Sequence, residues 1–255
     1  MILTVDIGNS IITLGGFSDT EPEFVSRMAT DPSLTSDEYA SKILAILSLR
    51  GSVASKVEGA IIASVVPQLN TVLKGAVKSL FGVDALVVGP GVKTGVPIRC
   101  DVPSTVGADL ICLAVAVKEL YTSPALVIDL GTVTNMVVIG DEGAFLGCAI
   151  MPGVSMSIDA LAEKTAQLPR VSLEVPASVI GKNTADCMRS GILYGHAAMI
   201  DGMIDKICRE YGKKLPIYVT GGFSDTVTPL LNHSVNVDPR LVLKGLYLIY
   251  KRTVK

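Results

Sequence analysis

Two short segments, half a chain apart, combine a carboxylate with a glycine and small polar residues. Asp6 precedes Gly8, Asn9 and Ser10, and Asp129 precedes Gly131, Thr132 and Thr134. Glycine lets the backbone approach a ligand closely, and successive N–H groups in such a turn form an anion-binding hollow. A carboxylate cannot bind phosphate itself, but it can hold a cation that does. One such turn alone favours an ordinary hairpin, whereas the pair predicts the two halves of a nucleotide-phosphate site.

A third carboxylate, Asp109, follows Gly107 and Ala108 at the predicted start of a helix. The positive end of a helix stabilises an ionised carboxylate. Such a carboxylate can accept a hydroxyl proton during phosphoryl transfer. From spacing alone, an aspartate that only caps its helix is an equally good interpretation.

Two further segments carry weaker signals. Gly221 and Gly222 follow a predicted strand and leave room for an adenine or a ribose, although a plain turn is the better interpretation of this segment alone. Thr165 and Thr184 place hydroxyl groups beside turn residues. The end of one helix and the cap of the next explain these two threonines equally well.

Composition argues against several other classes of function. A formal net charge of -2 provides no basic surface for nucleic acid, and two histidines are too few for a usual zinc site. No G-x-S-x-G segment supports Ser-His-Asp chemistry. Five scattered cysteines predict reduced thiols in the cytoplasm. The longest uncharged stretch, Gly143 to Ile158, is interrupted by glycine and proline, so we expect no membrane span. Met1 leads directly into an apolar run without a basic region or a small-residue cleavage site, so we expect no signal peptide.

The elements that must position these residues alternate between strands and helices. Each Asp-Gly turn joins an apolar strand to a second β-rich run. This repeat predicts two related halves, 1–120 and 121–255, with their boundary near residue 120. The alternation predicts α/β layering. Predicted strands include Ile11–Phe17, Gly59–Val66, Ala85–Val88, Met136–Ile139 and Ile217–Val219; predicted helices are Ser36–Leu49, Gln68–Phe81, Val106–Tyr121, Ser155–Leu161, Asn183–Tyr211 and Asp238–Arg252.

The ordered set of motifs resembles the type III pantothenate kinases of the acetate kinase–Hsp70–actin superfamily. The resemblance covers essentially the whole chain. It implies an α/β fold of two related ribonuclease H-like (actin-like ATPase) domains, each a mixed sheet flanked by helices. The matching segments are Asp6–Asn9, Ala63–Pro67, Gly89–Gly95, Gly107–Asp109, Asp129–Thr132, Met151–Gly153, Thr165–Pro169, Gly181–Thr184 and Asp238–Leu241.

This resemblance implies phosphorylation of pantothenate by ATP, the first step of coenzyme A biosynthesis. It also implies Mg²⁺, a monovalent cation (K⁺ or NH₄⁺) and a homodimer with interfacial sites. Asp109 matches the general base, Asp6 the magnesium ligand and Asp129 the residue at the monovalent cation. The residues matched to ATP are Asp6, Gly8, Asn9, Ser10, Gly131, Thr132, Thr134, Gly221 and Gly222; those matched to the acceptor are Cys100, Gly107, Ala108, Asp109, Leu110, Thr165 and Thr184, with Thr184 reaching the partner's site.

The acceptor side departs from the family pattern. Leu110 stands where the family usually has an arginine that clamps the substrate carboxylate, and Cys100 replaces a usual tyrosine. Losing one charged hydrogen bond costs about 1.5–3 kcal/mol, which Arg99 or Lys93 could offset. Two alternatives therefore stay open: a kinase of the same fold for another small hydroxyl compound, and a non-catalytic regulatory paralogue. The retained Asp109 argues against the second.

Overall fold

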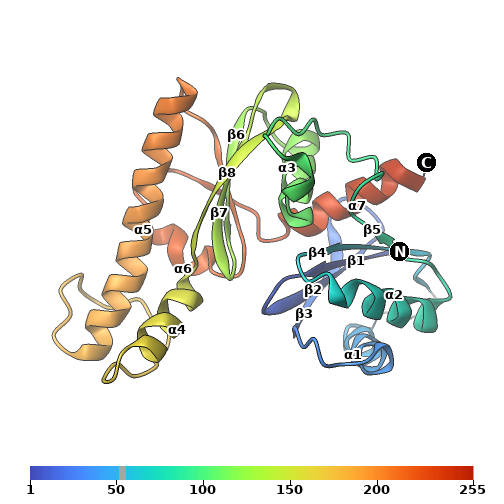
Figure 1. Cartoon of the computed structure of the whole chain (residues 1–255), viewed down its shortest axis with the longest axis horizontal. Coiled ribbons are helices and arrows are strands. Elements are labelled where there is room, and N and C mark those ends of the chain that lie inside the picture. Colours follow the sequence, from blue (N-terminus) through green and yellow to red (C-terminus); the bar gives the residue numbers. More distant parts are fainter. Residues whose placement is uncertain (52–55, 255) are drawn as a thin grey trace. The chain divides into compact units, whose positions relative to one another are not determined.

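The computed structural model describes residues 1–51 and 56–254 and divides into two compact units. Unit 1 contains Met1–Tyr121, Gly143–Phe145 and Leu241–Lys255. Unit 2 contains Thr122–Glu142 and Leu146–Arg240. Each unit is built on one sheet with helices packed against it (Figure 1). Within residues 1–51 and 56–254, no helix is long and apolar enough to cross a membrane.

The sheet of unit 1 has five strands in the order β3-β2-β1-β4-β5. Its central strand β1 runs antiparallel to β2 and parallel to β4. The strands are β1 (Ile2–Ile7), β2 (Ile11–Phe17), β3 (Pro22–Ala29), β4 (Gly59–Ser64) and β5 (Leu86–Val87).

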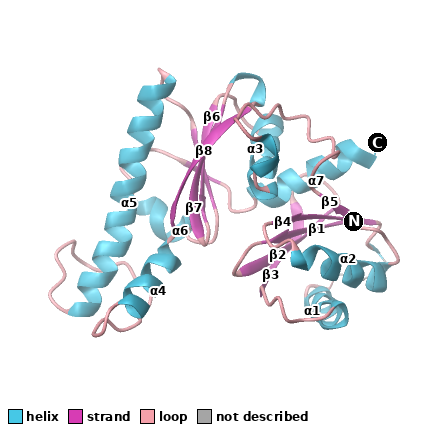
Figure 2. Cartoon of the chain, in the orientation of Figure 1, coloured by secondary structure: helices cyan, strands magenta, loops and turns pink. Residues whose placement is uncertain are grey.

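The sheet of unit 2 repeats this topology. Its order is β10-β9-β6-β7-β8, and its central strand β6 runs antiparallel to β7 and parallel to β9. The two sheets therefore match strand for strand, which confirms the predicted pair of related mixed sheets. Figure 2 shows the strands in magenta and the helices in cyan. The strands are β6 (Ala125–Leu130), β7 (Val133–Ile139), β8 (Phe145–Pro152), β9 (Ile217–Thr220) and β10 (Asn236–Val237).

Helices cover the sheets with apolar faces. In unit 1, α1 (Ser36–Leu49) and α2 (Gln68–Phe81) share a buried core with alternate residues of β1, namely Leu3, Val5 and Ile7. In unit 2, α4 (Val154–Lys164) and α5 (Thr184–Tyr211) share a core with Leu126, Ile128 and Leu130 of β6. The short helix α6 (Ser224–Val227) follows β9; single 3-10 turns occur at Pro103–Thr105, Asp141–Gly143 and Thr228–Leu230.

The other face of the first sheet is covered by α3 (Ala108–Leu120) and α7 (Leu241–Val254). These helices pack against each other, and α7 also contacts β1 and β4 (Figure 1). The two helices approach closely at Gly245, where a Cβ atom would overlap with the carbonyl of Cys112. Glycine permits this approach because it has no side chain. This grouping differs from the predicted halves: the C-terminal helix packs with the first unit, because its apolar residues are buried there.

Local signals in the sequence fix several helix ends. Thr35 and Glu38 form a reciprocal capping box at the start of α1. The side chain of Asn183 accepts the backbone N–H of Asp186 at 2.9 Å and caps α5, which ends at Gly212 in the left-handed region with φ 87°. Helix α7 begins three residues later than predicted, after Asp238 accepts the N–H of Arg240 at 3.0 Å.

Candidate active site

The first Asp-Gly turn lies between β1 and β2. The N–H of Gly8 donates to the carbonyl of Ile11 at 3.0 Å and closes the turn. The residue after β3 holds the turn from the side, because the Thr30 hydroxyl donates to the carbonyl of Gly8 at 2.7 Å. Asn9 and Ser10 are exposed at its tip. The backbone of this turn is therefore ordered, while its polar side chains remain open to solvent.

Asp6 lies on the face of β1 that α3 and α7 cover. It pairs in register with Thr13 of β2 and Ala63 of β4, on the side opposite the α1–α2 core. Burial, followed by the negative charges of Asp6 and Asp109, raises the pKa of the Cys112 thiol on α3. Both carboxylates therefore act on the same buried thiol, which places them on the same side of unit 1.

Asp109 lies in the first turn of α3, directly after Gly107 and Ala108. Within the described part of the chain, its Oδ1 atom is buried and has no hydrogen-bond partner. Burial raises the pKa of this carboxyl above its usual value, and the backbone N–H groups of Leu110 and Asp109 offset only part of that shift. A Cβ atom on Gly107 would overlap with Oδ1, so glycine leaves room for the carboxylate. Perturbed, incompletely bonded carboxylates of this kind are typical of functional sites.

The second Asp-Gly turn lies between β6 and β7 of unit 2. The N–H of Gly131 donates to the carbonyl of Val133 at 3.1 Å, as Gly8 does to Ile11 in unit 1. Asp129 lies on the sheet face opposite the α4–α5 core and pairs in register with Asn135 and Thr220. These two neighbours are buried, so three oxygen-bearing side chains lie on adjacent strands at this point.

Two glycines pack directly against the second turn. A Cβ atom on Gly153 would lie 2.7 Å from the carbonyl oxygen of Gly131, and one on Gly221 would lie 2.5 Å from the backbone of Leu130. Gly221 also has a φ of 96°, which favours glycine. The predicted Gly221 thus supports the turn, whereas Gly222 is exposed. Gly153 was not among the predicted site residues; its signal is the Met151–Gly153 segment before α4.

Thr134 lies on the opposite face of β7 from Asn135 and is fully buried. Its Oγ1 atom is 2.8 Å from Nε2 of His196, which is itself buried on α5. Burial lowers the pKa of the His196 imidazole. His196 is not among the predicted site residues, and its signal in the sequence is a single histidine among the apolar residues of a helix.

The residues matched to the acceptor divide between the two units. Gly107, Ala108 and the buried Leu110 adjoin Asp109 in unit 1, and Cys100 is partly buried in the loop that leads to α3. In unit 2, the Thr165 hydroxyl donates to the carbonyl of Leu161 at 2.8 Å and ends α4. Thr184 is exposed at the first position of α5. Within unit 1, Gly107, Ala108 and Leu110 are therefore the acceptor residues that adjoin the carboxylate.

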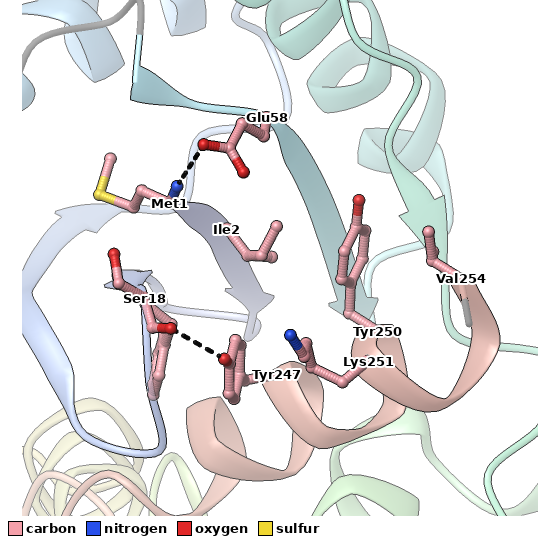
Figure 3. Close-up of a pocket in the computed structure, with 9 residues that line it drawn as sticks. Met1, Ile2, Ser18, Glu58, Tyr247, Tyr250, Lys251 and Val254 are labelled. Carbon is pink, nitrogen blue, oxygen red and sulfur yellow. Dashed lines mark hydrogen bonds and ion pairs between the residues drawn. The ribbon is translucent and has the colours of Figure 1, made fainter.

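A pocket of about 510 Å³ lies at the other end of β1 from Asp6. Figure 3 shows Tyr247, Tyr250 and Lys251 of α7 beside Met1 and Ile2, with the Tyr247 hydroxyl donating to the carbonyl of Ser18. The lining residues described for it include none of the predicted site residues. This pocket is therefore not one that the predicted site residues line.

Comparison with known proteins identifies the family of this chain. A model of the type III pantothenate kinase family matches residues 2–206. The chain belongs to this family. A type III pantothenate kinase from Moorella thermoacetica is 42% identical over 252 residues, which are 99% of each chain.

Solved structures show the same fold at much lower identity. A conserved putative Baf family transcriptional activator from Campylobacter jejuni has 17% identity and a TM-score of 0.62, with 98% of each chain covered. A putative 2-dehydro-3-deoxygalactonokinase from Sinorhizobium meliloti has 14% identity and a TM-score of 0.61, with 99% of this chain and 96% of that chain covered. At these identities the two structures support the fold alone.

Proposed function

We propose that this type III pantothenate kinase family member transfers the γ-phosphoryl group of ATP to the hydroxyl of pantothenate, with Asp109 as general base. The product is 4'-phosphopantothenate, the first intermediate on the way to coenzyme A. The observation that carries the proposal is the partly buried Asp109 in the first turn of α3, whose Oδ1 atom is buried without a partner, on the same side of unit 1 as Asp6. The family match and the 42% identical relative support the choice of acceptor.

The chemistry assigned to Asp109 is proton removal. Its carboxylate accepts the proton of the acceptor hydroxyl while that oxygen bonds to the γ-phosphorus and the bond to the leaving ADP breaks. A raised pKa makes the carboxylate a stronger base. It also brings the pKa of Asp109 nearer to neutral pH, which suits a general base that works there. Phosphoryl transfer otherwise depends on positioning and electrostatic stabilisation, which the N–H groups of the two glycine turns supply.

The donor atoms present fit the proposed cations. In the described residues no three His, Cys, Asp or Glu side chains gather as a metal site, but Mg²⁺ at phosphates needs only one or two carboxylates. Asp6 is the proposed magnesium ligand, and bound Mg²⁺ neutralises charge on the phosphates. Asp129, flanked in register by Asn135 and Thr220, is the proposed ligand of a monovalent cation, K⁺ or NH₄⁺.

The proposed enzyme is a homodimer of the cytoplasm. Thr184 is exposed at the start of α5, and the preceding loop exposes the apolar side chains of Val175, Val179 and Ile180. We assign these exposed apolar side chains to the interface with a second copy, and Thr184 to the partner's acceptor site. Cys100, Cys112, Cys187 and Cys208 are thiols, which supports a reducing compartment.

The test is phosphorylation of pantothenate by purified protein with ATP, Mg²⁺ and K⁺, compared with the Asp109→Asn variant. We expect turnover by the wild type and a loss of about 10²–10⁴-fold in the variant. No turnover by folded protein that binds ATP would overturn the assignment of pantothenate. The acceptor would then have to be another small hydroxyl compound, or the protein a regulatory paralogue.

A further inference from the structure

We propose that His196 is a positioning residue for ATP, because it holds Thr134 and thereby the second phosphate turn in place from helix α5. This inference rests on the proposed function, in which Gly131 and Thr132 contact the phosphates. It concerns a residue that makes no contact with the reacting atoms. His196 acts through Thr134, at a hydrogen bond of 2.8 Å between Nε2 and Oγ1.

Thr134 occupies a critical position in the turn. In the register of β6 and β7 it lies directly opposite Leu130, the last residue of β6. The turn between them is closed by the N–H of Gly131, which donates to the carbonyl of Val133 at 3.1 Å. Fixing the side chain of Thr134 therefore fixes the second strand one residue after this closing bond.

The hydrogen bond of His196 lies among apolar residues of α5. Ile192 and Leu193 lie one helical turn before it and Ile200 lies one turn after it, all buried in the core of unit 2. His196 and Thr134 are only 5% and 0% exposed, so water has little access to either group. A buried polar group left without a partner costs about 1–3 kcal/mol, which makes this bond a strong constraint on both side chains.

The imidazole of His196 is neutral when it bonds Thr134. Burial lowers the pKa of His196, so it carries no charge at neutral pH. A neutral imidazole has one N–H and one acceptor nitrogen, and a threonine hydroxyl can donate or accept. Both tautomers therefore allow the bond. Helix α5 thus fixes the turn without placing a charge beside the phosphates.

The kinetic consequence concerns ATP rather than the acceptor. A loose turn misplaces the N–H groups that meet the phosphates, and small misplacements of this kind reduce rates strongly. A histidine that only fills space in the core would influence the stability of unit 2 and both substrates equally. The two roles therefore separate in a comparison of ATP and pantothenate kinetics.

The experiment compares His196→Leu, His196→Gln, Thr134→Val and the control His233→Gln. His233 is the other histidine of the chain, and its Nε2 atom lies 3.2 Å from a carboxylate oxygen of Asp205 at the surface. For His196→Leu we expect kcat/KM for ATP to fall about tenfold, the loss of roughly one net hydrogen bond, with the KM for pantothenate within about twofold of wild type. We expect His196→Gln, which keeps a nitrogen donor, to recover most of that loss, and His233→Gln to match wild type.

Thr134→Val tests the pair itself. If His196 acts through Thr134, the double variant His196→Leu/Thr134→Val is no worse than the more affected single variant. Additive losses would show that the two residues act independently and would overturn the proposal. Equal losses for ATP and pantothenate, with a lower Tm and no recovery in His196→Gln, would also overturn it.

ATP affinity measured by calorimetry separates this inference from the proposed function. If wild-type protein binds ATP but does not phosphorylate pantothenate, the proposed function fails, while weaker ATP binding by His196→Leu still supports the role of His196. If the wild type phosphorylates pantothenate and His196→Leu binds ATP as tightly as wild type, the positioning role fails and the proposed function stands.

Discussion

Gly107 leaves the space that the carboxylate of Asp109 occupies. A Cβ atom at residue 107 would overlap with Oδ1 of Asp109, which is the end of a side chain and can move aside. The backbone at Gly107 has a φ of -59°, which any residue can adopt. Substitution at this position should therefore displace the proposed base without unfolding the protein.

We accordingly expect Gly107→Ala to lower kcat by about ten- to hundredfold, part of the contribution of a general base. Its cost to stability should stay within about 1 kcal/mol, because alanine is a poorer N-cap than glycine. Steady-state kinetics and thermal denaturation measure the two effects. Gly191→Ala on α5 is the matched control, since a Cβ atom there meets no described atom within 4 Å. Unchanged kcat in Gly107→Ala would contradict the role given to Asp109.

Asp109→Asn should separate activity from stability. Its buried carboxyl has a raised pKa, so the folded state disfavours the ionised form, and this opposes folding at neutral pH. Removing the charge should leave Tm unchanged or raise it, while turnover falls by about 10²–10⁴-fold. A clear drop in Tm would instead indicate that the carboxylate is a structural cap of α3, and retained turnover would show that another group is the base.

The stability of the protein should depend on pH through His196. Its pKa is lowered from the usual value of 6.5 by burial, so the unfolded chain binds a proton at a pH where the folded chain does not. The contribution of neutral His196 to the free energy of unfolding is fully present above pH 6.5. It declines as the pH falls through 6.5 toward the lower pKa that His196 has in the folded protein.

Urea denaturation at pH 5.5 and pH 7.5 measures this dependence. His196→Gln cannot titrate, so its stability should change less between the two pH values than that of the wild type. His233→Gln keeps His196 and is the control for the loss of a histidine elsewhere in the chain. The same pH dependence in wild type and His196→Gln would show that other groups cause it.

Leu110→Arg tests whether the acceptor site lacks a positively charged side chain for the carboxylate of pantothenate. Leu110 is 6% exposed in the first turn of α3, beside the proposed base. If an arginine here reaches the carboxylate of pantothenate, the KM for pantothenate should fall by ten- to hundredfold, the value of about 1.5–3 kcal/mol for a charged hydrogen bond. Leu110→Met is the control of similar volume. An unchanged or higher KM in Leu110→Arg would indicate that a different residue already binds this carboxylate.

Local patterns in the sequence predicted the main elements. The bounds of α1, α2 and β2 match the predicted ranges, because helical periodicity, capping residues and turn glycines are properties of neighbouring residues. Two Asp-Gly turns in equivalent places predicted the repeated sheet. Strands β3, β8 and β10 were not predicted. In β3, charged residues interrupt the apolar pattern, and in β8, glycine interrupts an uncharged run, so pairing with a neighbour decides these strands.

Tertiary packing decided what the local patterns left open. The apolar face of α7 predicts burial but not its partner, and the packing of this helix on α3, β1 and β4 assigns it to the first unit. Burial of Asp109 supports a base rather than a simple cap. The alternation of β7 puts Thr134 on the face opposite Asn135, but the sequence does not say which helix covers that face. The fold brings His196 to Thr134 across 62 positions, because side chains meet through packing and not through their order in the chain.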